Sequence, residues 1–320
     1  IAPNKSDSTQ SSGGTIIISP SGNVQSSTVT NKPTTNKPTT TTPTRPAVTR
    51  KNYTFSNIAV TNSSKTLSSS TFSRLNSLIS NYRNTYGRTA GVYVINLKDG
   101  MTFSYNANKY IFAASTVKLP FEYYCYSQIA NGKVSLNATK RYDERFRRGG
   151  TGVMKNYKSG GYWTMRTLLD YTVRYSDNVA YYMILEHFGH TGYNQMLKSH
   201  GFNTDINNDP KFGSVSPRLL ATYWQKIYQN QKAKPTSVWN TLLTSAKNTT
   251  WSPIRSALGN KTVANKSGWA TASFHDSGIV YGQNPYVVVV MTTGEGYNSD
   301  QTFVANVVKE VDKIINAYNK

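Results

Sequence analysis

The amino-acid sequence predicts an α/β (α+β) domain in which one sheet is built from strands near both ends of the folded region. Period-two apolar patterns, typical of strands, occur early and late in this region. The middle part, from about Thr164 to Leu243, has helical spacing and no predicted strand, so we expect an inserted helical subdomain. The predicted strands are Gly91 to Leu97, Met101 to Tyr105, Val263 to Lys266, Ser273 to Tyr281 and Tyr286 to Thr292.

The other elements, taken in order, place Ser115 at the start of a helix. A helix from Leu67 to Tyr86 precedes the first strand, and a hairpin turn follows that strand. Ser115 then opens a helix that runs to about Ile129, and an amphipathic helix that includes Phe303 to Tyr318 closes the chain. The middle part has helical segments near Thr164 to Arg174, Val179 to Phe188, Gly192 to His200 and Pro217 to Gln229.

The residues before Tyr53 have the composition of a linker. They contain no aromatic residue, although 12% of the whole chain is aromatic, so they have little with which to build a core. Between Thr28 and Thr49, ten of the 22 residues are Thr, and the sequence NKPTT occurs twice. We therefore expect a disordered Thr/Pro/Ser/Lys-rich stalk at residues 1–52 and one domain at residues 53–320. Such stalks are typical of extracytoplasmic proteins, which predicts a secreted or cell-envelope-associated protein.

The charge of the chain points to an anionic partner. It has 36 Lys and Arg residues against 15 Asp and Glu residues, a formal charge of +21. The densest basic run of the folded region extends from Lys140 to Arg148, and it is either a solvated face or a contact for anionic wall polymers. No nucleic-acid-binding module accompanies it, so nucleic acid is not an expected partner. No window approaches 18 consecutive apolar residues, so no membrane-spanning helix is predicted.

The cysteine and histidine content excludes other classes of site. The single cysteine, Cys125, has no partner for an intramolecular disulfide, and the four histidines are scattered, so disulfide scaffolds and structural zinc are excluded and no metal site is expected. Cys125 lies on an apolar helix and is predicted to be a buried packing residue. His275 and Asp276 are adjacent on a predicted strand and point to opposite faces, which argues against a Ser-His-Asp triad.

Three short polar motifs occur in order along the folded region. In the first, a serine at the first helical turn and a lysine three residues later share one helix face, and the helix N-terminus favours negative charge on Ser115 Oγ. A desolvated Lys118 near a second cation, Lys266, would have a lowered pKa and would serve as the general base that activates the serine. The motifs are STVK from Ser115 to Lys118, SDN from Ser176 to Asn178, and KSG from Lys266 to Gly268.

In this order the motifs resemble those of the penicillin-recognising serine enzymes, which include class A β-lactamases and D,D-peptidases. The resemblance extends from about Tyr53 to Lys320 and includes Phe112-Ala113-Ala114 before the serine and Tyr175 before the second motif. It implies a β-lactamase and transpeptidase-like fold, with an antiparallel sheet from both chain ends, flanking helices and an inserted all-helical subdomain. It also implies serine acyl-transfer chemistry on β-lactams or peptidoglycan stem peptides, without a cofactor.

The resemblance implies a set of catalytic residues. Ser115 would be the acylated nucleophile and Lys118 its proton acceptor, while Ser176 would relay the proton to the leaving nitrogen. Lys266, also counted as catalytic, would meet the substrate carboxylate together with Ser267.

The resemblance also implies further substrate contacts. Asn178 would hydrogen-bond the side-chain amide of the substrate, and Gly268 would leave room for the substrate along the edge strand. The backbone N–H groups of Ser115 and Trp269 would form the oxyanion hole. The ring of Trp269 would either shape the rim of the cleft or simply pack.

One loop departs from the class A β-lactamase pattern. Those enzymes carry a glutamate on a long loop that activates the deacylating water, whereas the corresponding stretch here, Gly201 to Pro217, is shorter and contains no glutamate. Its acids, Asp205 and Asp209, are expected to cap turns rather than to position a water. Glu186, nearby in sequence, is expected to be a surface or capping carboxylate.

Without a deacylating base, acylation proceeds while hydrolysis of a bound β-lactam is slow, which favours a penicillin-binding, D,D-peptidase-like enzyme acting on D-Ala-D-Ala ends. Two alternatives remain. One is a class A-like β-lactamase that positions its water with another group. The other is a weakly active cell-wall-binding module, against which the intact Lys118 and Lys266 argue.

Overall fold

The structure is a computed structural model that describes residues 48–208 and 211–320. Most of the predicted stalk at residues 1–52, and also Asp209, therefore lie outside the described residues. The first strand begins at Lys51, just before the predicted domain start at Tyr53. Within the described residues, no helix combines the length and the apolar character needed to cross a membrane.

One seven-stranded antiparallel sheet forms the centre of the domain. Its strands are β1 (Lys51–Phe55), β2 (Ile58–Ser63), β3 (Ala90–Asn96), β4 (Thr102–Tyr105), β9 (Val263–Ala270), β10 (Ser273–Val280) and β11 (Tyr286–Thr292). The spatial order is β1-β2-β4-β3-β11-β10-β9, so the early and late strands meet where β3 pairs with β11, for example at Val92 and Val290. The predicted sheet built from both chain ends is confirmed.

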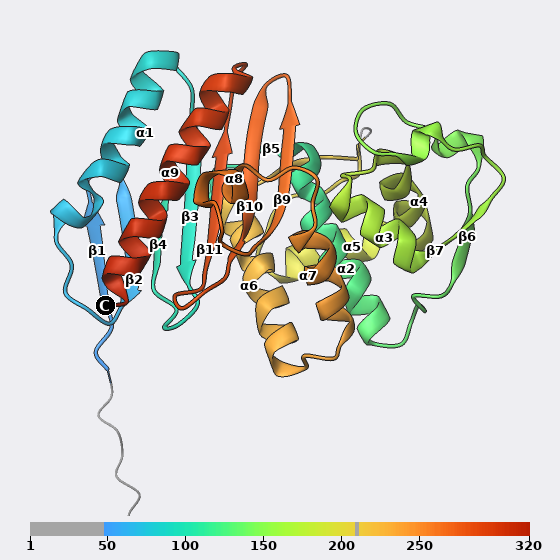
Figure 1. Ribbon diagram of the computed structural model, residues 1–320, viewed down its shortest axis with the longest axis horizontal. Coiled ribbons are helices and arrows are strands. Elements are labelled where there is room, and N and C mark those ends of the chain that lie inside the picture. The colour runs from blue at the N-terminus through green and yellow to red at the C-terminus, as the bar shows by residue number, and fades with distance from the viewer. Residues whose placement is uncertain (1–47, 209–210) are drawn as a thin grey trace, which may run out of the picture. The chain divides into compact units, whose positions relative to one another are not determined.

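Helices cover both faces of the sheet. On one face lie α1 (Ser73–Tyr86), α8 (Pro253–Leu258) and α9 (Tyr297–Tyr318), and Figure 1 shows α1 and α9 side by side across the strands. On the other face α6 (Pro217–Ala233) contacts β3, β10 and β11. Alternate residues of β11 enter the two apolar cores, Val288 on the α9 side and Val289 on the other. Burial on both faces explains the continuous apolar run of this strand.

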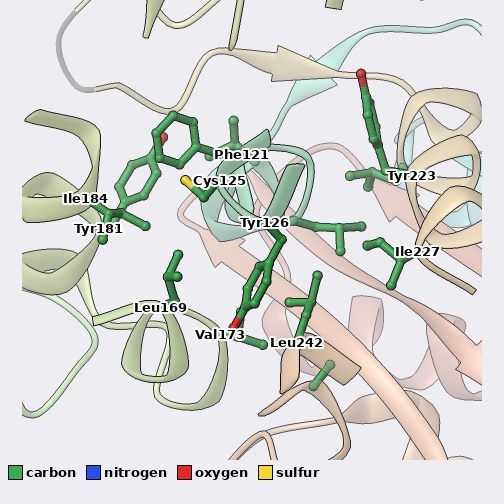
Figure 2. Packing of buried hydrophobic residues seen from close by; sticks show 14 of the residues in the cluster. Phe121, Cys125, Tyr126, Leu169, Val173, Tyr181, Ile184, Tyr223, Ile227 and Leu242 are labelled. Atoms are coloured by element: carbon green, nitrogen blue, oxygen red, sulfur yellow. The ribbon is translucent and has the colours of Figure 1, made fainter. Parts of the chain in front are cut away.

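The inserted subdomain is arranged around α2 (Lys118–Ala130). Its other helices are α3 (Met165–Arg174), α4 (Asn178–Phe188), α5 (Thr191–Ser199) and α7 (Val238–Lys247). Figure 2 shows Phe121, Cys125 and Tyr126 extending from α2 into this apolar core. Cys125 has no exposed area, so its prediction as a buried packing residue is confirmed.

The subdomain is not all-helical, which corrects one detail of the prediction. Two small antiparallel pairs occur in it: β5 (Ile111–Phe112) with β8 (Ser214–Val215), and β6 (Thr139–Arg141) with β7 (Tyr162–Thr164). Strands of two or three residues are too short for a period of two to be visible in the sequence. The β5–β8 pair joins the segment before Ser115 to the loop at residues 201–217, and so it helps to position the site.

Candidate active site

A cavity of about 370 Å³ lies where the edge strand β9 faces the helical subdomain. The structure brings residues of all three motifs to this cavity. Those that line it are Ser115, Ser176, Lys266, Ser267 and Gly268, and Trp269, directly after the third motif, lines it too. Residues that the sequence left without a role line it as well, among them Gly150, Thr151, Arg174, Thr249, Thr250 and Trp251.

Ser115 lies in a 3-10 turn, Ala114–Val117, that leads directly into α2. This turn replaces the regular helical start that the sequence predicts. Lys118, the first residue of α2, places its Nζ 3.3 Å from Ser115 Oγ. The lysine predicted to be the general base is therefore within reach of the serine hydroxyl, as the spacing of the motif requires.

Gly268 allows β9 to pack directly against this turn. A Cβ atom added at Gly268 would lie 2.8 Å from Ser115 N and 2.7 Å from Thr116 N, which is closer than packed atoms allow. The sequence assigned the absent side chain to substrate space along the strand. The structure supplies a different reason, because the glycine allows the edge strand to approach the backbone of the serine turn.

Lys118 is fully buried and hydrogen-bonded on its polar side. Its Nζ donates to the Ser176 carbonyl at 2.7 Å and to Asn178 Oδ1 at 2.7 Å, and it lies 3.4 Å from Ser176 Oγ. Burial lowers the pKa of Lys118 well below its usual range, and the nearby Lys266 ammonium lowers it further. A neutral amine, which a general base requires, is therefore favoured at this position.

Lys266 extends from β9 to the same serine. Its Nζ donates to Ser176 Oγ at 3.0 Å and to the Ser267 carbonyl at 2.7 Å. Burial lowers the pKa of Lys266 to about 7, although the negative charges of Asp276 and Glu122 oppose this shift. The Ser176 hydroxyl thus has a lysine amine on each side, which suits it to pass a proton.

The turn that carries Ser176 is held by a buried aspartate. Ser176 has a positive φ of 52°, and the next residue, Asp177, caps α4 by accepting from Ala180 N at 3.0 Å. The second carboxyl oxygen of Asp177 accepts from Val153 N at 2.6 Å and Met154 N at 2.8 Å. Asp177 therefore ties the motif to the segment after the basic run. The sequence gave no role to this residue, because its partners are backbone groups far along the chain.

The opposite side of Lys118 is aromatic. Its Nζ lies 5.4 Å from the ring centre of Tyr181 and 5.7 Å from that of Phe212, which belongs to the loop at residues 201–217. Within the described part of that loop, Asp205 accepts from Asn207 N at 3.2 Å and so caps a turn, as predicted. The loop therefore brings an aromatic ring toward the buried amine.

Trp269 stands at the rim of the cavity. Its side chain is 53% exposed, and its ring meets Tyr297 edge-on with ring centres 5.8 Å apart. The two residues also line a neighbouring cavity of about 380 Å³. Of the two readings that the sequence left open for this ring, the structure favours the rim.

The model of the β-lactamase enzyme family matches residues 72–317 of the chain, which is most of its length. The protein belongs to this family. Fold and family together make it a serine hydrolase of the β-lactamase and penicillin-binding superfamily.

Solved structures of this superfamily resemble the chain closely in fold. A structure of PBP-A shares 26% identity, with a TM-score of 0.66 over 75% of this chain and 97% of that one. A mutant of PBP-A, as its acyl-enzyme complex with penicillin G, shares 24% identity, with a TM-score of 0.68 over 75% and 96%. The β-lactamase of Sphaerobacter thermophilus DSM 20745 shares 19% identity, with a TM-score of 0.70 over 77% and 98%. No curated protein matches the chain.

In this β-lactamase-family enzyme, His275 supports the segment before the serine. It is fully buried, its Nε2–H donates to the Phe112 carbonyl at 2.8 Å, and its Nδ1 accepts from Thr292 N at 3.2 Å. Burial lowers the pKa of His275 to about 4, so the ring is neutral near pH 7. Both ring nitrogens are thus occupied by the backbone.

The basic run of the enzyme is largely ion-paired. Lys140 Nζ and Arg145 lie 2.8 Å and 2.6 Å from carboxyl oxygens of Glu186, which is itself an exposed residue. Arg147 pairs with Glu144 in the same way. Glu186 is therefore a surface carboxylate, as predicted, and these contacts favour the solvated-face reading of the run.

Proposed function

We propose that the protein is a penicillin-binding, D,D-peptidase-like enzyme with Ser115 as its nucleophile, acting on the D-Ala-D-Ala ends of peptidoglycan stem peptides. The asymmetry around the Lys118 amine carries this proposal. Its polar partners are at Ser115, Ser176 and Asn178, whereas the loop at residues 201–217 brings the Phe212 ring toward it. In the described residues no carboxylate is hydrogen-bonded to Lys118 or Ser115. Within the described residues, which leave out Asp209, the site therefore has the groups for forming an acyl-enzyme but no carboxylate placed to activate water against it.

Acylation begins when neutral Lys118 accepts the Ser115 hydroxyl proton while Oγ bonds to the substrate carbonyl carbon. The bond from that carbon to the leaving nitrogen then breaks. The nitrogen takes the Ser176 hydroxyl proton, and the Lys118 ammonium returns its own proton to Ser176. The distances from Lys118 Nζ to the two serine oxygens, 3.3 Å and 3.4 Å, support this relay.

The substrate contacts in this proposal follow the geometry of the cleft. Lys266 and Ser267, on the edge strand, would receive the carboxylate at the end of the substrate, and the Asn178 amide would meet its side-chain amide. The Ser115 and Trp269 N–H groups would stabilise the oxyanion, which is usually the largest single contribution to the rate. The close packing of Gly268 against the serine turn supports this role, since it brings the two backbone segments together.

A β-lactamase is the second candidate function, because the family carries that name and the enzyme from Sphaerobacter thermophilus shares the fold. Both candidates use the same acylation step. They differ in the lifetime of the acyl-enzyme, which is long without an activated water and short with one.

The intact mass of the protein mixed with benzylpenicillin, followed from seconds to hours, tests the proposal. We expect a stoichiometric adduct that lasts for hours, and no adduct in Ser115→Ala. An adduct that vanishes while excess drug is consumed would favour the β-lactamase. An unmodified wild-type protein would overturn the proposal and favour the wall-binding module, and labelling of Ser115→Ala would overturn the assignment of the nucleophile.

The proposed substrate lies outside the cytoplasm, so we also propose that the protein is exported and associated with the cell envelope. The composition of residues 1–52 supports export. Cell fractionation with an antibody tests this, and a protein found only in the cytoplasmic fraction would contradict it. A partnership with anionic wall polymers would act through the net charge of +21 and should weaken as salt is added.

A further inference from the structure

A second cavity, of about 380 Å³, adjoins the catalytic cavity. The two cavities share three lining residues at the end of β9 and in the turn after it, namely Trp269, Ala270 and Thr271. The second cavity is also lined by Phe274 on β10 and by Tyr297 at the beginning of α9. Figure 1 shows the β9–β10 hairpin and the beginning of α9 at the same end of the strands. A molecule that lies along β9 can therefore extend from the catalytic cavity to the second one.

The order of residues along β9 sets the direction of the substrate. In the proposed function, Lys266 and Ser267 receive the carboxylate at the leaving end, and the Trp269 N–H group receives the oxygen of the reacting carbonyl. These residues follow one another along one extended strand. The acyl part of the substrate lies on the other side of the reacting carbonyl, so it continues toward Ala270 and Thr271. The second cavity lies at this end of the strand.

A cluster of aromatic rings connects the two cavities. Trp251 lines the catalytic cavity and stacks on Tyr297, with ring centres 6.3 Å apart and an angle of 19° between the ring planes. Tyr297 meets Phe274 and Trp269 edge-on, with ring centres 5.3 Å and 5.8 Å apart. The side chains of Trp269 and Tyr297 are 53% and 46% exposed, although both are large and apolar. Aromatic side chains around a concave surface are typical of a ligand-binding pocket.

The second cavity offers few polar groups and no unmatched charge. Among the described residues, Asp300 is the only charged residue that lines it. Its Oδ1 accepts from the Tyr82 hydroxyl at 2.7 Å and from Arg88, whose Nη1 also pairs with it as an ion pair at 3.0 Å. Ser273 lines the cavity too, is buried, and has no hydrogen-bond partner for its Oγ among the described residues. The cavity therefore suits an uncharged, largely apolar group.

We propose that the second cavity is a subsite for the acyl part of the substrate, where it takes an uncharged apolar group, with an aryl ring fitting best. Such a ring packs edge-on against Trp269 and Tyr297 and removes apolar area from water. A sugar ring fits less well, because each hydroxyl that it buries needs a hydrogen-bond partner. This inference rests on the proposed function, since that function fixes the direction of the substrate along β9.

The rates of acylation by two penicillins test the proposal. Benzylpenicillin carries a phenyl ring on its acyl group, whereas 6-acetamidopenicillanic acid carries only a methyl group there. Intact-mass kinetics of the full chain, at penicillin concentrations well below saturation, give the second-order rate constant for each. Benzylpenicillin should react about 5- to 20-fold faster, because its ring buries apolar area against other rings. Equal rate constants would overturn the proposal.

Tyr297→Ala assigns this preference to the second cavity, because Tyr297 lines that cavity but not the catalytic one. The rate constant for benzylpenicillin should fall by about 3- to 10-fold, while that for the acetamido compound should change less than about twofold. Tyr162→Ala is the matched control. It removes a tyrosine that is 71% exposed on β7 and lines neither cavity, so the preference should remain. A preference that survives in Tyr297→Ala, or an equal fall of both rate constants, would overturn the proposal.

An NMR titration tests the subsite without acylation. The full chain with Ser115→Ala, labelled with ¹³C in its tyrosine rings, is titrated with each penicillin, and the Tyr297 signal is identified by its loss in Tyr297→Phe. Benzylpenicillin should shift this signal, whereas 6-acetamidopenicillanic acid should leave it in place. A signal that stays in place with both compounds, or moves equally with both, would overturn the proposal. A wild-type protein that forms no adduct would contradict the proposed function and leave the titration measurable, so the two failures are distinguishable.

Discussion

The two sides of the Lys118 amine differ sharply in chemistry. One side holds the oxygens of Ser115, Ser176 and Asn178, between 2.7 and 3.4 Å away, and the other holds the rings of Tyr181 and Phe212. Under the proposed function, the polar side supplies the groups that accept and pass on the Ser115 proton. Within the described residues, the aromatic side supplies no carboxylate that would activate a water. On that proposal one shared base serves acylation well and deacylation poorly, and each prediction below breaks or sharpens this difference.

The largest effect is expected from removing the proposed general base, Lys118. Lys118→Ala removes the group that accepts the Ser115 proton, so acylation by benzylpenicillin should slow by about 10²–10⁴-fold. Stopped-flow or intact-mass kinetics measure the rate. The melting temperature of the variant serves as the control for folding. A rate within a few-fold of the wild type would show that another group acts as the base.

Gly268→Ala should have the next largest effect, because its Cβ would lie 2.8 Å from Ser115 N and push β9 away from the serine turn. We expect the acylation rate to fall by about 10²–10³-fold, the loss typical of one oxyanion-hole donor. Gly161→Ala is the matched control, since a Cβ there meets its nearest atom, Trp163 Nε1, at 3.7 Å. Unchanged acylation in Gly268→Ala would show that the close packing of β9 on the serine turn is not needed to form the oxyanion hole.

Phe212→Glu changes the aromatic side into an acidic one. A carboxylate beside Lys118 should accept a proton from water, and the penicilloyl adduct should disappear about 10- to 100-fold faster than in the wild type. Phe212→Leu, which stays apolar, should keep the long-lived adduct. Asp205→Asn should keep it too, because the Asp205 carboxylate caps its own turn. An equally stable adduct in Phe212→Glu would mean that this side chain does not control deacylation.

The smallest effect concerns the pH profile of acylation. Lys118 must be neutral to accept a proton, so the rate should fall as the pH drops below its pKa, which burial and the Lys266 ammonium lower. Lys266→Met removes that second cation. The pKa of Lys118 should then rise, and the acid limb at saturating penicillin should move to higher pH. A limb that stays in place would show that the two lysines are not coupled.

The sequence predicted most of the sheet and of the larger helices, because each has a period that its own residues carry. It did not resolve β1 and β2, whose exposed polar residues weaken the pattern, or the very short strands of the inserted subdomain. The sequence predicted that α2 begins at Ser115, whereas it begins at Lys118 after a 3-10 turn, because a 3-10 turn and an α-helix have similar sequence signals.

By itself the sequence determined the three motifs, and with them the expected nucleophile, base and edge strand, because the spacing from Ser115 to Lys118 is local and a helical turn converts it directly into geometry. Only the tertiary structure decided that Gly268 packs on the serine turn, that Phe212 lies near Lys118 and that Glu122 is buried with no hydrogen-bond partner among the described residues. The first two contacts join segments that are far apart in the sequence. The burial of Glu122 depends on which elements pack against its face of α2. Burial then decides the charge of each group, which the residue type alone leaves open.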